Sequence, residues 1–119
     1  GWARGYGVWA VEETATGAFV GQAGLAAMER SSEVEVLYAL GRAFWGRGYA
    51  REAAAAALGF GFETVGLDHI VAFVVPENTA SARVLEAVGL RSIGDTDYNG
   101  FTVCGFRIEA ADWRARGQA

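Results

Sequence analysis

Several residue types that define common classes of protein are scarce in this sequence. All ten basic residues are arginine, cysteine and histidine occur once each (Cys104 and His69), and the apolar stretches are too short to cross a bilayer. A single cysteine excludes an internal disulfide, and a single histidine leaves too few soft ligands for a zinc site. We therefore expect no metal, no membrane span and a cytoplasmic location.

The charge balance argues against a nucleic-acid partner. The formal net charge is -4, and the arginines are scattered singly along 119 residues, so no basic patch is indicated. This length suits one compact domain, which we assign to residues 1–119. Because the chain starts at Gly1 rather than Met and enters a strand pattern within a few residues, we expect it to lack an N-terminal segment.

The first part of the chain predicts three strands. Apolar stretches at 6–12 and 19–28 flank the turn signal at 14–17, which is typical of an antiparallel hairpin. Residues 33–40 alternate in side-chain type and predict a third strand that pairs with the second.

A helix and a buried strand are predicted next. Small and apolar residues recur at helical spacing over 50–65, which predicts one helix that packs closely on a sheet and ends at Gly66. The dense β-branched and aromatic run over 69–75 is typical of a central strand.

The last part of the chain predicts a helix and a hairpin. Asn78 is a good N-cap and Gly89 a good C-cap for the helix, and Asn99-Gly100 is a strong hairpin signal between two final strands. The polar tail from Asp112 is expected to fray. The predicted order is β-β-β-α-β-α-β-β, a mixed α/β (α+β) fold with one parallel pair across the first helix.

The glycine-rich loop W-G-R-G-Y-A at 45–50 precedes a helix that has no strong side-chain cap, so backbone N–H groups are available to an anion. A Walker loop needs a lysine, which this chain lacks, so nucleoside triphosphate hydrolysis is excluded. A Rossmann fingerprint beginning at Gly46 fits Gly48 but meets Arg51 where its third glycine belongs. A plain tight turn is the remaining alternative.

Taken with its surroundings, this loop resembles the pyrophosphate loop of the GNAT superfamily of N-acetyltransferases, whose pattern is Gln/Arg-x-x-Gly-x-Gly/Ala. Gly48 and Ala50 match the last two defined positions, whereas Trp45 replaces Gln/Arg and is similar to the RimJ/RimL-type branch. Residues 35–40 (EVLYAL) are similar to that branch's fourth strand. The segment 76–90 resembles its N-x-x-S…G-F segment through Asn78, Ser81, Gly89 and Leu90.

The resemblance runs from about Gly7 to Trp113 and lacks the family's first strand and first two helices, which should precede Gly1. It implies a mostly antiparallel central sheet, splayed at the fourth and fifth strands of the family fold, and acetyl-coenzyme A as co-substrate. The pantetheine arm would pair with the backbone of Tyr38, Ala39 and Leu40. The residues implied at the pyrophosphate are Arg47, Gly48, Tyr49 and Ala50.

In the family, a neutral amine attacks the thioester directly. The resemblance makes Glu35 the first candidate to orient or deprotonate the amine, with Glu33 as the alternative on the same strand face; a solvated strand edge is the simpler interpretation of both. A tyrosine that often serves as general acid is replaced by Leu85. Ser81 would hydrogen-bond the leaving thiolate, and we expect Asn78 and Ser81 both to cap the helix and to contact the cofactor.

We therefore expect an acetyl-coenzyme A-dependent N-acetyltransferase that acts on a protein N-terminus or a small-molecule amine. The alternative is a non-catalytic acyl-coenzyme A binding module or an inactive fragment. Without the missing segment the strand at 7–12 would keep an unprotected edge, which favours self-association, including a homodimer. Tyr98, beside the predicted turn, stays open between a pocket rim and simple exposure.

Overall fold

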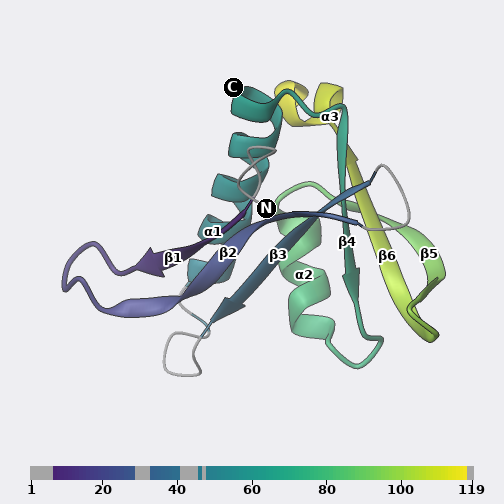
Figure 1. Cartoon of the computed structure of the whole chain (residues 1–119), viewed down its shortest axis with the longest axis horizontal. Helices are drawn as coiled ribbons and strands as arrows, with labels where there is room; N and C mark the ends of the chain where they lie inside the picture. Colours follow the sequence, from purple (N-terminus) through teal and green to yellow (C-terminus); the bar gives the residue numbers. More distant parts are fainter. Residues whose placement is uncertain (1–6, 29–32, 41–45, 47, 118–119) are drawn as a thin grey trace.

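A computed structural model describes residues 7–28, 33–40, 46 and 48–117. Six strands form one sheet in the order β1-β2-β3-β4-β6-β5, and every neighbouring pair is antiparallel except β3 with β4 (Figure 1). The mixed α/β fold and its mostly antiparallel sheet confirm the predicted fold class. The strands are β1 (Gly7–Glu12), β2 (Phe19–Ala27), β3 (Val34–Leu40), β4 (His69–Val74), β5 (Arg91–Tyr98) and β6 (Phe101–Glu109).

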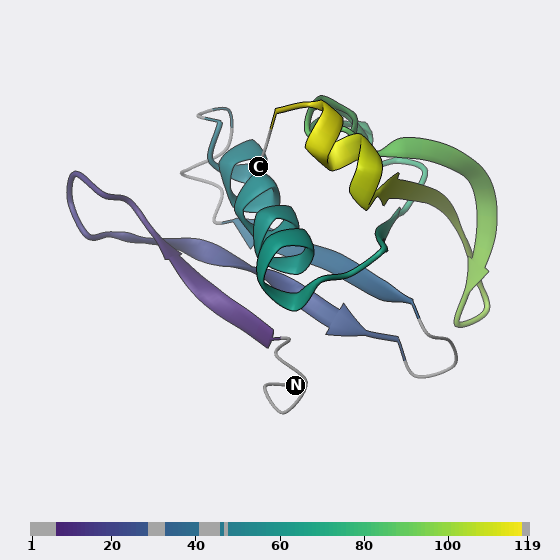
Figure 2. The same ribbon diagram turned by 90° about the horizontal axis from the view of Figure 1, so that it is seen from above.

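The helices are α1 (Tyr49–Gly59), the π-helix η3 (Phe60–Val65), α2 (Thr79–Ala87) and α3 (Ala110–Ala115). Helix α1 lies over β2 and β3 on one face of the sheet (Figure 2). It shares one hydrophobic core with α2, because alternate residues of β3, β4 and β6 point to the same side. In the part of the chain that is described, no helix is both long enough and apolar enough to span a membrane.

Small side chains let the first helix approach the sheet, as predicted. A Cβ atom at Gly61 would lie only 2.7 Å from Cδ1 of Ile70 and 3.1 Å from Cδ1 of Leu25. The helix ends at Gly66, whose φ of 83° is the left-handed conformation expected of a C-cap. Its last six residues are π-helical rather than α-helical, which the sequence pattern did not predict.

The C-terminal tail corrects one prediction. Instead of fraying from Asp112, the chain forms α3 and buries Trp113, which is 3% exposed. The Trp113 ring lies 5.8 Å from that of Phe62, and its Nε1–H donates to Glu63 Oε2 at 3.0 Å. Burying one large aromatic side chain outweighs the polar composition around it, because aromatic residues contribute the most apolar area.

The β5–β6 hairpin bends across the sheet. Its turn is the predicted one, since Asn99 and Gly100 have φ of 53° and 88°, both positive as a type I′ turn requires. The pairing register shifts between Ser92 and Gly94, and Gly94 has a φ of 91°. A bulge of this kind increases strand twist, and β5 curves in Figure 2.

Candidate active site

The parallel strands β3 and β4 separate soon after they meet. They share one paired position, Glu35 opposite Val71, whereas β3 pairs with β2 along its whole length. Beyond Glu35, residues 36–40 of β3 therefore have no strand partner on the β4 side among the described residues. We call the diverging segments 36–40 and 72–74 the β3–β4 wedge; in Figure 1 the two strand ends point apart and α2 lies between them.

The start of α1 lies at the end of the sheet where the wedge opens (Figure 1). No side chain caps this helix; its N-cap is Gly48, with a φ of 81°, and Gly46 has a φ of 78°. Both glycines adopt a backbone conformation that residues with a Cβ rarely take. Tyr49 and Ala50 form the first turn, and Arg47 lies outside the described residues.

Helix α2 begins at the same end of the molecule and is tied to β3. The side chain of Asn78 caps it by accepting a hydrogen bond from the Ser81 backbone N–H at 3.1 Å, which confirms the predicted N-cap. The Tyr38 hydroxyl lies 2.7 Å from Ser81 Oγ and donates to the Ser81 carbonyl at 3.2 Å. Burial raises the pKa of Tyr38 and outweighs the opposing effect of the Ser81 hydrogen bond, so this phenol stays protonated at neutral pH. Leu85, 1% exposed, lies in the core and brings no polar group to the wedge.

Glu35 occupies the other face of the sheet, at the point where the wedge begins. Its neighbours Val34 and Val36 face the helices, so strand alternation directs Glu35 away from them. It is 7% exposed, and Tyr98 of β5 donates a hydrogen bond to Glu35 Oε2 at 2.8 Å. Burial raises the pKa of Glu35, and the Tyr98 hydrogen bond partly opposes that rise. The solvated-edge interpretation of Glu35 is therefore wrong.

Glu33 is less suited to the role of base. Its Oε2 lies 2.6 Å from Nε2 of His69, so this carboxylate is already engaged, and its side chain is 30% exposed. Of the two carboxylates on this strand face, Glu35 is the one that combines burial with a position at the wedge.

Two contacts at the wedge were missed at the level of sequence. Alternation along β3 puts Tyr38 on the face opposite Glu35, but its partner Ser81 is 43 residues away. Tyr98 was left between a pocket rim and simple exposure, whereas its hydroxyl reaches Glu35 and its ring centroid lies 5.0 Å from that of Phe73. No local pattern signals either pairing.

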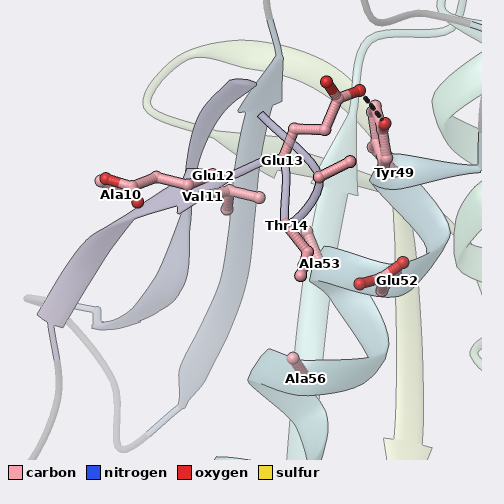
Figure 3. A pocket seen from close by; sticks show the side chains of 10 residues that line it. Ala10, Val11, Glu12, Glu13, Thr14, Tyr49, Glu52, Ala53 and Ala56 are labelled. Atoms are coloured by element: carbon pink, nitrogen blue, oxygen red, sulfur yellow. Dashed lines mark hydrogen bonds between the residues drawn. The ribbon is translucent and has the colours of Figure 1, made fainter. Parts of the chain in front are cut away.

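A cavity of about 450 Å³ lies between the β1–β2 connection and the first half of α1 (Figure 3). The Tyr49 hydroxyl donates to the Glu13 carboxylate at its edge. Glu12 and Glu52 also line it. Three carboxylates would repel a phosphate, so this cavity does not suit a pyrophosphate despite its nearness to the start of α1.

Ala39 and Leu40 complete the predicted set on β3. Their backbone belongs to the unpartnered edge of the wedge, together with that of Tyr38. The structure thus brings two groups of predicted residues to one end of the sheet: the β3 edge with Asn78 and Ser81, and the glycine-flanked start of α1.

Residues 1–91 match the family described as "Acetyltransferase (GNAT) domain". The chain belongs to this family. Since the match covers most of the sequence, the superfamily resemblance seen in the loop and strand motifs is confirmed.

Two curated relatives and one solved structure show how far the likeness extends. The uncharacterized protein YkkB of Bacillus subtilis is 41% identical over 91 residues, covering 73% of this chain and 53% of YkkB. The uncharacterized N-acetyltransferase p20 of Bacillus licheniformis is 36% identical over 66 residues, covering 56% of this chain and 37% of p20. A crystal structure of an acetyltransferase from Agrobacterium tumefaciens is similar with a TM-score of 0.78 at 31% identity, covering 88% of this chain and 61% of that one. The chain spans about half the length of YkkB and less of p20.

Proposed function

We propose that the chain binds acetyl-coenzyme A and transfers its acetyl group to a primary amine, either a protein N-terminus or a small molecule. One observation supports this most: Glu35 and Ser81 lie on opposite faces of the sheet at the same wedge. The loop with Trp45 in place of Gln/Arg, and the Asn78–Ser81 segment, favour the RimJ/RimL-type branch.

The residues present fit the co-substrate. An extended, amide-bearing arm can add to an open strand edge, and the backbone of Tyr38, Ala39 and Leu40 offers such an edge. The pyrophosphate would bind at the start of α1, where the backbone of Gly48, Tyr49 and Ala50 is not covered by a capping side chain. Arg47 would add positive charge there. These assignments place the thioester in the wedge, between the two faces.

The chemistry follows from that placement. The amine nitrogen forms a bond to the thioester carbonyl carbon, the carbon–sulfur bond breaks, and a proton leaves the nitrogen. Glu35 takes this proton, directly or through a water molecule, from the face on which it lies. Sulfur leaves as a thiolate toward the opposite face, where the Ser81 hydroxyl can donate a hydrogen bond to it. Tyr38 holds Ser81 in place for this role.

Two measurements test the proposal. Calorimetric titration of the full chain with acetyl-coenzyme A measures binding, and release of free thiol in the presence of an N-terminal alanine peptide or a short diamine measures transfer. We expect both signals. A folded chain that neither binds acetyl-coenzyme A nor releases thiol would refute the proposed function.

A second candidate function is a non-catalytic acyl-coenzyme A binding module. The observation that favours it is Leu85, which replaces a frequent general acid and is buried in the core. Binding without thiol release for any amine tested would support this alternative, since its only requirement is the open strand edge and the helix start.

A further inference from the structure

The contact between Tyr98 and Glu35 joins strands that are far apart in the sheet. In the order β3-β4-β6-β5, three steps separate their strands. Strands are spaced by about 4.8 Å, so a flat sheet would hold these backbones about 14 Å apart. The hydroxyl nevertheless lies 2.8 Å from Glu35 Oε2, because the tip of the bent β5–β6 hairpin comes over the face that carries Glu35.

Tyr98 is held from two sides in addition to this bond. It is the last residue of β5 and pairs with Phe101 across the Asn99-Gly100 turn, which fixes its backbone. Its ring packs on Phe73 of β4 with an interplanar angle of 49°. The turn and the ring contact thus orient the phenol toward the carboxylate, in addition to the hydrogen bond.

The remaining neighbours of Glu35 do not supply a competing charge. The residues paired with it across the sheet are Ala26 of β2 and Val71 of β4, both uncharged. The titratable groups of β3, β4 and β6 on this face contact one another, Glu33 with His69 and Arg107 with Glu109. Arg91 of β5 stands opposite Arg107, three strands away from Glu35. Of the residues that the structure describes, Tyr98 is the one that hydrogen-bonds the Glu35 carboxylate.

We infer that Tyr98 is a positioning residue for Glu35: its hydroxyl anchors one carboxylate oxygen and favours the ionised form, so that the other oxygen can accept the proton of the acceptor amine. This inference rests on the proposed function only for the identity of the proton donor. A hydrogen bond to a charged acceptor stabilises the ionised form relative to the neutral one. The same contact acts on the phenol, since the hydrogen bond to Glu35 is the largest cause that raises the pKa of Tyr98.

The direct test needs no substrate. The full chain is labelled with ¹³C in the glutamate side chains, the Glu35 signal is assigned by its loss in Glu35→Gln, and its titration is followed by NMR. In Tyr98→Phe the pKa of Glu35 should rise, because the ring contact with Phe73 is kept and only the hydroxyl is removed. The matched control is Tyr38→Phe, which removes a phenol hydroxyl from the strand of Glu35 on the opposite face and should leave this titration unchanged.

A second variant should shift the pKa of Glu35 in the opposite direction. Placing 3-fluorotyrosine at position 98 makes the phenol a stronger donor, so the pKa of Glu35 should fall below that of the unmodified chain. An unchanged Glu35 titration in both Tyr98 variants would overturn the inference, and so would equal changes in Tyr98→Phe and Tyr38→Phe.

The kinetic test separates this inference from the proposed function. With acetyl-coenzyme A and the N-terminal alanine peptide, Tyr98→Phe should move the acid limb of kcat/KM to higher pH and lower the rate on that limb about tenfold. Ionisation of the peptide amine affects both proteins equally and cancels from the comparison. No thiol release by the unmodified chain with either the peptide or the short diamine would refute acetyl transfer but leave the NMR result valid. Transfer with identical pH profiles in the two proteins would refute the role of Tyr98 and leave the function standing.

Discussion

A negative charge at the start of α1 should weaken acetyl-coenzyme A binding, and the chain offers a closely matched control for this prediction. Gly48 precedes the helix with a φ of 81°, and Gly66 ends the same helical segment with a φ of 83°. A Cβ at either position would meet no atom within 4 Å. Gly48→Glu and Gly66→Glu therefore add the same side chain, with the same backbone strain of about 1 to 2 kcal/mol, at opposite ends.

The expected loss of affinity follows from the charge. A carboxylate about 5 Å from one phosphate charge is opposed by about 3 kcal/mol at an effective dielectric constant of about 20, and solvent screening at this exposed position reduces that to roughly 1 to 2 kcal/mol. Acetyl-coenzyme A should therefore bind roughly five- to thirtyfold more weakly to Gly48→Glu. Gly66 lies about 25 Å away along the helix, well beyond the screening length of about 8 Å, so Gly66→Glu should bind normally.

Thermal stability should rank the two variants in the opposite order to affinity, with Gly66→Glu the less stable. A carboxylate is favoured at the N-terminal end of a helix and disfavoured at the C-terminal end, each by about 0.3 to 1 kcal/mol. Gly66→Glu should therefore unfold at a lower temperature than Gly48→Glu while keeping its affinity. The assays are calorimetric titration at low and high salt, where the loss in Gly48→Glu should shrink with added salt, and thermal unfolding. Equal affinities for the two variants would refute a pyrophosphate site at Gly48.

Four further predictions concern three positions, Glu35, Asn78 and Gly61. Glu35→Gln should lower acetyl transfer about 100-fold or more without changing the dissociation constant of acetyl-coenzyme A. Burial raises the pKa of Glu35 above its value in the unfolded chain, so the charged carboxylate destabilises the fold at neutral pH. Glu35→Gln should therefore raise the Tm at neutral pH, and should not raise it at a pH below the unfolded-state pKa, where the carboxyl is protonated in both states. Asn78→Ala should lose the α2 cap and about 1 kcal/mol of unfolding free energy in denaturant titration, whereas Asn78→Asp keeps an acceptor and most of the stability. Gly61→Ala should lower the unfolding free energy by about 1 to 3 kcal/mol, because it forces a methyl group against Ile70. Gly59→Ala, whose new methyl group would lie 3.6 Å from Trp113, should leave the unfolding free energy unchanged or raise it. Equal effects of the two substitutions would contradict the close approach at Gly61.

Local signals in the sequence predicted the elements and their limits well. Asn78 caps α2, Gly66 ends the first helical segment, and Asn99 with Gly100 form the hairpin turn, all as predicted. These features depend on a few neighbouring residues: a side-chain acceptor near a helix start, or a backbone that tolerates positive φ. The same reasoning failed for the tail from Asp112, because its polar composition gives no sign of the helix that the buried Trp113 holds in place.

The sequence by itself determined the family resemblance and the loop with which α1 begins, since both are written in consecutive residues. It also put Glu35 on one strand face and Tyr38 on the other, because side chains alternate along a strand. Only the tertiary structure decided that Glu35 is buried and held by Tyr98, and that Tyr38 meets Ser81. The physical reason is that these contacts depend on how far β3 and β4 diverge and how strongly β5 bends at its bulge. Both quantities come from the packing of the whole sheet and not from any short segment of it.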